Sequence, residues 1–289
     1  MSYIYHIVII SLIYSILSVS LNIIVGYTGL LSIGHATFYG IGAYTSAILC
    51  AKYGFPFWAG LIAGAALAAM LGAILGFPIL RVRGDYLIIA TLGFCEIVRA
   101  LMLNWDSLTE GPRGITGVPP AKFLWLYFGT DTGFLGLVSF FFIFTIIIAL
   151  FIKHSPFGRI LSGIRQDEFA VSCLGKNVAY YKIVSLGIGS FFAGIAGSLY
   201  AHFISFIDPS TFTVTESILI FCMVVLGGFG SVTGSIISAI LLTALPEALR
   251  FVELSGTFMP NVREIIYGII LIALMLYKPN GLMGKYSIS

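Results

Sequence analysis

Reactive side chains are few in this sequence, and no set of them has a recognised catalytic or metal-binding spacing. The histidines and cysteines are His6, His35, His154, His202, Cys50, Cys95, Cys173 and Cys222. The cysteines form no C-x-x-C pair and have no companion histidines at zinc-binding spacing. We therefore expect no metal site, and we expect the cysteines to behave as small apolar residues.

Motifs for nucleotide or acyl chemistry are missing as well. The sequence contains no G-x-x-x-x-G-K-[ST], no H-E-x-x-H and no G-x-S-x-G. The nearest approach to a phosphate loop, Gly175-Lys176-Asn177, lacks both the leading glycine and the hydroxyl residue. We therefore expect a protein that is not an enzyme and that uses no cofactor, so any ATP hydrolysis must belong to another chain.

Polar groups within long apolar stretches are the remaining candidate site residues. They are Asn22, His35, Glu96, Arg99 and Glu216. A charge at the bilayer centre costs ~2.5–3.5 kcal/mol even on the mildest scale, so such groups should face a cavity or each other. Glu96 and Arg99 stand three apart and can pair, either as an ion pair buried between helices or as part of a substrate path. For the other three residues, the alternatives are an interhelical hydrogen bond and a substrate contact.

The elements that must position these residues are membrane-spanning helices. Of the 289 residues, 59% are hydrophobic and 9% are charged, whereas a soluble domain carries about 25% charged residues. The first apolar run has no basic residue between Met1 and Ile7 and continues past Leu21, so we expect a retained span and not a signal peptide. The formal net charge of +3 is too small to indicate a nucleic-acid partner.

Apolar runs long enough to cross a hydrocarbon layer about 30 Å thick recur along the whole chain. We predict an all-α, polytopic helix bundle that forms a single transmembrane domain over residues 1–289, with roughly nine spans and a range of about 8 to 10. The predicted spans are Ile4–Val25, Gly29–Ala51, Phe57–Leu80, Tyr86–Leu103, Phe134–Ile152, Ile183–Phe203, Glu216–Gly227, Ser235–Leu249 and Val262–Tyr277. The second and the seventh are glycine-rich or short, which favours broken or re-entrant helices that line a cavity.

Small residues recur every four positions in two of these spans. The third span has Gly60, Gly64, Ala68, Gly72 and Gly76, and the sixth has Gly189, Ala193, Gly197 and Ala201. Such rows allow close approach of a neighbouring helix. Tight packing inside one subunit and a contact between subunits are both possible interpretations.

The positions of lysine and arginine predict the orientation in the membrane. Basic residues collect at 81–83, at 153–182 and at 278–285, which places these segments in the cytoplasm. Residues 104–133 mix acidic and basic side chains with Trp105, Trp125 and Tyr127, as expected at the opposite interface. The N-terminus is then outside, and the C-terminus is cytoplasmic.

The basic loop at about 153–182 is amphipathic where a plain connector would be simply polar. Ser155 can cap a first short helix that opens at Pro156, and Asp167 can cap a second that Gly175 ends. In the second helix Phe169, Ala170, Cys173 and Leu174 form an apolar face. A helix of about two turns is unstable alone, so it needs the membrane surface or a groove on a cytoplasmic partner.

Short motifs spread along nearly the whole chain carry a family resemblance. They are LN at 21–22, GYTGLLSIGHA at 26–36, GIGAY at 40–44, RGDYL at 83–87, TLGF at 91–94, EIVR at 96–99, GITG at 114–117, SPFGR at 155–159, IR at 164–165, DE at 167–168, VLGGFGS at 225–231 and PE at 246–247. In this order they resemble the LivM-type permease subunits of bacterial ABC importers for branched-chain amino acids.

This resemblance implies a type II importer-like permease in the bacterial plasma (inner) membrane, which forms half of an alternating-access pore for leucine, isoleucine and valine. The implied partners are a second, LivH-type permease, two cytoplasmic ABC ATPases and an extracytoplasmic substrate-binding protein. The segment that would couple to the ATPases comprises Asp167, Glu168, Phe169, Ala170, Leu174 and Gly175. It is similar to the E-A-A…G coupling segment, with Phe169 in place of one alanine and the glycine one residue late.

Three alternatives remain open at this point. Relatives of such permeases carry urea, short amides or aromatic acids, and nothing in the chain indicates a leucine pocket. A membrane-embedded enzyme would need Glu96, His35 or His202 to converge on one cavity. A secondary transporter would be expected to show inverted repeats, and none is visible.

Overall fold

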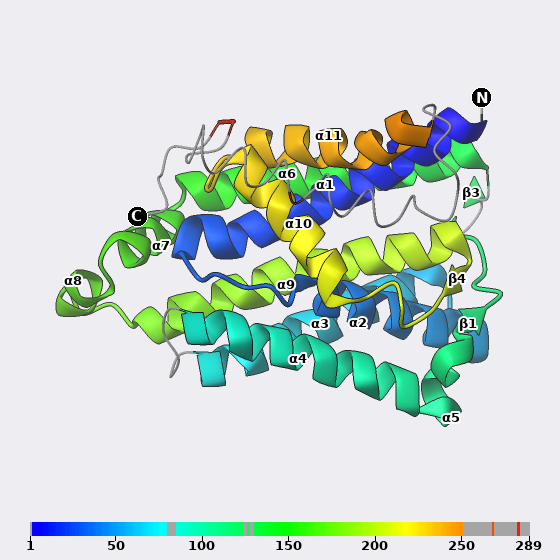
Figure 1. Ribbon diagram of the computed structural model, residues 1–289, viewed down its shortest axis with the longest axis horizontal. Coiled ribbons are helices and arrows are strands. Elements are labelled where there is room, and N and C mark those ends of the chain that lie inside the picture. The colour runs from blue at the N-terminus through cyan, green and yellow to red at the C-terminus, as the bar shows by residue number, and fades with distance from the viewer. Residues whose placement is uncertain are drawn as a thin grey trace.

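The computed structural model describes residues 2–79, 85–123, 126–127, 130–250, 268 and 282–283, and most of them are helical. The long helices are α1 (Ser2–Thr28), α3 (Phe57–Ile79), α4 (Asp85–Asn104), α6 (Asp131–His154) and α9 (Val178–Ile204). Each is long and apolar enough to cross a membrane. They run roughly parallel to one long axis (Figure 1). The predicted all-α membrane bundle is therefore confirmed.

Three shorter apolar helices occupy the other predicted spans. These are α2 (His35–Ala47), which continues as the π-helical turn η1 (Ile48–Lys52), α10 (Val214–Gly227) and α11 (Val232–Arg250). Among the described residues, helices thus lie in each of the first eight predicted spans. The ninth, Val262–Tyr277, falls outside them apart from residue 268.

Helix α9 is the centre of the bundle and packs against α1, α2 and α3. The rows of small residues make this possible, because a Cβ atom added at Gly72 of α3 would lie 2.6 Å from the Cβ of Ser190 in α9. Ser198 Oγ donates to the carbonyl of Gly42 at 3.2 Å, so α2 and α9 are close enough for side-chain-to-backbone bonding. The small residues therefore mediate packing inside one chain, which is the first of the two interpretations of the rows.

Helices α2 and α10 begin in the middle of the bundle. Residues 29–34 form no helix, and the first residue of α2, His35, contacts Ser20 two turns before the end of α1, with 2.7 Å between Nε2 and Oγ. Residues 208–213 likewise form no helix before α10. The Ala36 N–H donates to Ser217 Oγ in the first turn of α10 at 3.0 Å. The two N-termini therefore meet inside the bundle, in the two segments predicted to be broken.

The two ends of the bundle carry different structures (Figure 1). At one end lie α5 (Asp106–Thr109), η2 (Gly111–Arg113) and four two-residue strands. The strands are β1 (Ile115–Thr116), β2 (Lys122–Phe123), β3 (Leu126–Tyr127) and β4 (Phe206–Ile207), and β1 pairs antiparallel with β4 and β2 with β3. At the other end lie α7 (Pro156–Gln166) and α8 (Glu168–Cys173). The basic loop and the segment around 104–123 therefore lie at opposite ends, as the predicted topology requires.

Candidate functional site

Helices α7 and α8 form a small, well-capped unit, which we call the coupling unit (residues 155–175). Ser155 Oγ accepts a hydrogen bond from the Gly158 N–H at 3.2 Å, and Pro156 is the first residue of α7. Asp167 Oδ1 accepts from the N–H groups of Phe169 and Ala170 at 2.9 and 3.0 Å. Both predicted N-caps are confirmed, and Gly175 ends the unit with φ +73°.

The apolar face of α8 points away from the rest of the chain. Phe169 and Leu174 are each 77% exposed, and Ala170 and Cys173 are exposed beside them. Only Val171 is buried in α8. Exposed apolar surface of this kind on a short helix is typical of a site that docks against another protein.

Two contacts that the sequence did not suggest hold α8 in place. Lys182 Nζ, at the start of α9, lies 2.7 Å from Glu168 Oε2, and the Lys182 side chain is only 11% exposed. Val171 Cγ2 lies 3.0 Å from the position of a Cβ at Gly163, so α8 rests closely on α7. The only signal for the ion pair was the basic character of Lys182 near an acidic helix start.

Arg165 connects the coupling unit to the membrane helices. Its Nη1 donates to the carbonyl oxygen of Gly26, in the last turn of α1, at 2.5 Å. Its guanidinium carbon also lies 5.5 Å from the ring centroid of Phe229, in the turn between α10 and α11. No spacing in the sequence relates Arg165 to partners so distant in the chain.

Asn22 is the most extensively hydrogen-bonded of the five predicted intramembrane residues. It is 2% exposed, and its Nδ2 donates to the Ser231 carbonyl at 3.0 Å and to Ser235 Oγ at 2.8 Å. Its Oδ1 accepts from the Gly230 N–H at 2.9 Å. Asn22 therefore satisfies polar groups of the α10–α11 turn, as the interhelical alternative predicts.

His35 and Glu216 lie close to the meeting point of the two half-length helices. His35 is fully buried and contacts Ser20 as described above. Glu216, in the first turn of α10, accepts a hydrogen bond from the Tyr14 hydroxyl and is half-buried. Both residues make the predicted interhelical contacts, and Glu216 also keeps part of its surface open.

Glu96 and Arg99 form the predicted pair on α4. Arg99 Nη2 lies 2.7 Å from Glu96 Oε2, and Arg99 Nε also donates to the same oxygen at 3.0 Å. The side chains are 32% exposed for Arg99 and 47% exposed for Glu96. The interpretation of an ion pair buried between helices of this chain is therefore wrong, because α4 turns this face outward.

Helices α4 and α10 contact each other and lie on the same side of the bundle (Figure 1). On α10, Thr215 and Ile218 are exposed, and Glu216 between them is partly exposed. Glu96, Arg99 and Glu216 are thus on two helices that are in contact, whereas His35 and Asn22 are buried. We call this surface the α4–α10 face.

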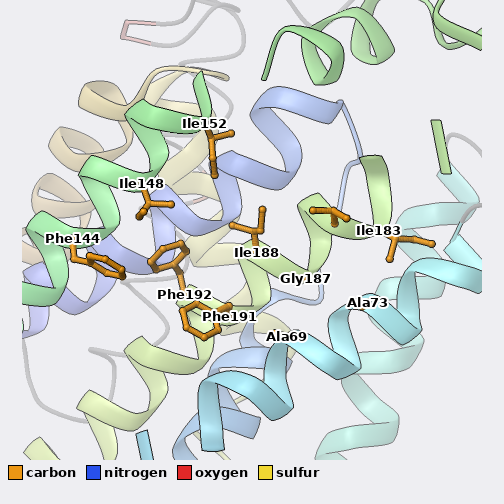
Figure 2. Close-up of a pocket in the computed structure, with 11 residues that line it drawn as sticks. Ala69, Ala73, Phe144, Ile148, Ile152, Ile183, Gly187, Ile188, Phe191 and Phe192 are labelled. Atoms are coloured by element: carbon orange, nitrogen blue, oxygen red, sulfur yellow. The ribbon is translucent and has the colours of Figure 1, made fainter. Parts of the chain in front are cut away.

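A groove of about 540 Å³ lies elsewhere, between α3, α6 and α9. Figure 2 shows Phe144, Ile148 and Ile152 of α6 facing the side chains of α9, and Ala69 and Ala73 of α3 complete the lining. Its lining side chains are all apolar. A charged solute would find no polar partner among these side chains, so the groove does not suit the amino-acid substrate that the family resemblance implies.

His202 does not lie with Glu96 and His35 in one site. His202 is buried in α9, where Nε2 lies 2.9 Å from Ser46 Oγ and Nδ1 lies 2.7 Å from the Pro119 carbonyl. No group of three histidine, cysteine or acidic residues that could hold a metal occurs within the described ranges. The scattered arrangement gives no support to the enzyme alternative.

Comparison with known proteins agrees with this geometry. Residues 3–275 match the family described as "Branched-chain amino acid transport system / permease component". The chain is 39% identical to the high-affinity branched-chain amino acid transport system permease protein LivM of Escherichia coli (strain K12), over 94% of this chain and 68% of that protein. It is 27% identical to a probable LivM of Methanocaldococcus jannaschii, over 94% of this chain and 90% of the relative. It is also 26% identical to LivH of E. coli, over 94% and 91%. The chain therefore belongs to the family of permease components of branched-chain amino acid transport systems.

Proposed function

We propose that this chain is a membrane-spanning permease subunit of an ABC importer and forms half of the pathway for leucine, isoleucine and valine. The family match and the relatives named LivM and LivH support this role. The structural observation that supports a link to ATPase subunits is helix α8, which is capped and has an outward apolar face at one end of the membrane bundle. The chain itself does no chemistry and serves as the transport subunit.

The complete transporter then contains further chains. A second, homologous permease of the LivH type supplies the other half of the pore, two cytoplasmic ABC ATPases hydrolyse ATP, and an extracytoplasmic binding protein delivers the substrate. The complex lies in the plasma (inner) membrane of a bacterium with the coupling unit in the cytoplasm, because lysine and arginine collect in the sequence at 153–182 and cytoplasmic loops carry an excess of these residues.

The segment at 167–175 is the coupling contact with one ATPase. Phe169 and Leu174 would enter a groove of the ATPase as apolar anchors, and full burial would stabilise the contact by about 1.5–3 kcal/mol for each side chain. The membrane surface is a weaker explanation for this exposure, because Asp167 and Glu168 begin the helix and Lys182 holds it against α9.

A pull-down with the ATPases tests the coupling contact. The double variant Phe169→Ala, Leu174→Ala should fold normally and lose its ATPases. The matched control, Phe140→Ala, Ile143→Ala, removes similarly exposed apolar side chains from α6 and should retain them. Normal ATPase recovery with the Phe169 and Leu174 double variant, together with normal transport, would refute this role of α8.

The translocation path runs along the α4–α10 face. A charged pair that is 32% and 47% exposed on a spanning helix would be costly against lipid, so this surface should face water or the second permease. The nearby N-termini of the half-length helices add support, because transporter sites are commonly built from broken helices inside the membrane. Glu96, Arg99 and Glu216 are then the path residues, with His35 and Asn22 in support behind them.

The substrate is the part of the proposal that relies on the relatives, and a permease for urea or a short amide is the competing assignment. Deletion of this chain's gene should abolish high-affinity uptake of labelled leucine by intact cells, and the plasmid-borne gene should restore it. Unchanged leucine uptake with loss of urea uptake would reject the branched-chain assignment in favour of the alternative.

A further inference from the structure

Arg165 makes its two long-range contacts to parts of one packed unit. Gly26, whose carbonyl accepts from Arg165, lies one turn beyond Asn22 on α1. Phe229, which lies under the guanidinium, is 4% exposed and precedes Gly230, whose N–H donates to Asn22. A Cβ atom at Gly26 would lie 2.6 Å from the Gly230 nitrogen, so the end of α1 and the α10–α11 turn are in direct contact.

The chemistry of these contacts favours a rigid connection. A cation is stabilised at a helix C-terminus, where the carbonyl groups of the last turn lack partners. A guanidinium can also lie over an aromatic ring while its planar fork donates elsewhere, which a lysine ammonium does less well. The Arg165 stem is held too, because its Cγ lies 3.1 Å from the position of a Cβ at Gly29.

Arg165 is also close in the chain to the start of α8. Arg165 is two residues before Asp167, the N-cap of α8, and Glu168 is paired with Lys182 at the base of α9. A displacement of α8 would therefore act on two places in the membrane domain. One is α9 through Lys182, and the other is the junction of α1 with the α10–α11 turn through Arg165.

We propose that Arg165 is a positioning residue for transport, which fixes the coupling unit to the end of α1 and to the α10–α11 turn so that movement of α8 reaches α10. Helix α10 carries Glu216 at its other end, on the α4–α10 face. This inference rests on the proposed coupling role of α8. It adds the residue through which a movement at the ATPase would reach the path.

The test compares Arg165→Ala, Arg165→Lys and Arg159→Ala in the assembled transporter, reconstituted with the second permease, the ATPases and the binding protein. Arg159 lies on the same helix, and its exposed guanidinium makes no hydrogen bond or ion pair within the described part of the chain. Three quantities are measured for each complex: the amount of bound ATPase, the rate of ATP hydrolysis and the amount of leucine transported for each ATP hydrolysed.

Arg165→Ala should retain its ATPases and continue to hydrolyse ATP, while leucine transported for each ATP falls about tenfold, within the usual range of coupling between sites. Arg165→Lys should recover part of this ratio, and Arg159→Ala should match the unaltered chain. An unchanged ratio in Arg165→Ala, or an equal fall in Arg159→Ala, would overturn the inference. If the unaltered chain itself fails to bind ATPases, it is the proposed function that fails.

A disulfide gives a second test that does not depend on the stability of Arg165→Ala. The Arg165 Cβ lies 3.7 Å from the position of a Cβ at Gly29, within the range of about 3.5–4.5 Å found in disulfides. Gly29→Cys with Arg165→Cys, in a Cys173→Ser background, should couple poorly when reduced and regain coupling when oxidised. The reduced form is the matched reference, because a cysteine at φ +75° is strained in both forms. Crosslinked protein that does not regain coupling would contradict a rigid connection.

Discussion

The polar contacts of Asn22 give the most quantitative prediction about this fold. Asn22→Leu keeps a side chain of similar size and removes three hydrogen bonds at once, those to the Ser231 carbonyl, to Ser235 Oγ and from the Gly230 N–H. All three groups belong to the α10–α11 turn or the first turn of α11, and the site is 2% exposed. Ser235 Oγ and the Gly230 N–H would therefore lose this partner where water cannot replace it, while the Ser231 carbonyl would keep the hydrogen bond from the Ser235 N–H at 3.1 Å.

The expected destabilisation follows from the number of bonds. One interhelical hydrogen bond in a membrane protein contributes about 0.6 kcal/mol on average and ~1.7 kcal/mol at most. Three bonds to a buried turn should therefore lower the free energy of unfolding by about 2–4 kcal/mol. Reversible unfolding in mixed micelles, followed by circular dichroism, measures this difference.

A matched control separates the interhelical bonds from the loss of a polar atom alone. Thr145 is 1% exposed, and its hydroxyl donates only to the Phe141 carbonyl of the same helix, at 2.8 Å. Thr145→Val should therefore lower the stability by less than about 1 kcal/mol. Equal effects of Asn22→Leu and Thr145→Val would refute the reasoning that Asn22 holds the α10–α11 turn.

Three further predictions follow from packing, exposure and charge. Gly42→Ala should lower the free energy of unfolding by about 1–3 kcal/mol, because its Cβ would lie 2.5 Å from an α9 backbone carbon; Gly136→Ala, with nothing within 4 Å of its Cβ, should be neutral in the same assay. Cys173 is the one exposed thiol among the four, so an impermeant maleimide should label it in inside-out vesicles from which the ATPases have been removed, and labelling from outside intact cells would overturn the topology. Glu96→Gln should change the stability of the isolated chain by at most about 1 kcal/mol, because the pair with Arg99 is partly exposed, yet should reduce leucine uptake by the assembled transporter; normal uptake would argue against a path along the α4–α10 face.

Local features of the fold were predictable from the sequence because their causes are local. The caps at Ser155 and Asp167 need only a side-chain oxygen within three residues of a free N–H. The row of small residues on the third span predicted close packing, and the Glu96–Arg99 spacing predicted a pair. The broken starts of α2 and α10 followed from their glycine content and length.

Features that depend on which helix faces lie inside the bundle were not predictable in the same way. Lipid and protein interior are both apolar, so hydropathy does not distinguish the buried α1 from the outward α4. This is why the sequence left open whether the Glu96–Arg99 pair is buried between helices or lies on an accessible surface. The contacts of Arg165 with Gly26 and Phe229 were missed for another reason, since they join residues far apart in the chain by tertiary packing alone.

ATP-driven uptake of labelled leucine into proteoliposomes tests the proposed function most directly. The vesicles contain this chain, the second permease and the ATPases, and the binding protein is added outside. We predict uptake that requires ATP and this chain, that isoleucine and valine inhibit, and that urea does not inhibit. Leucine uptake of equal rate in vesicles that lack this chain, or accumulation of urea in place of leucine, would contradict the account.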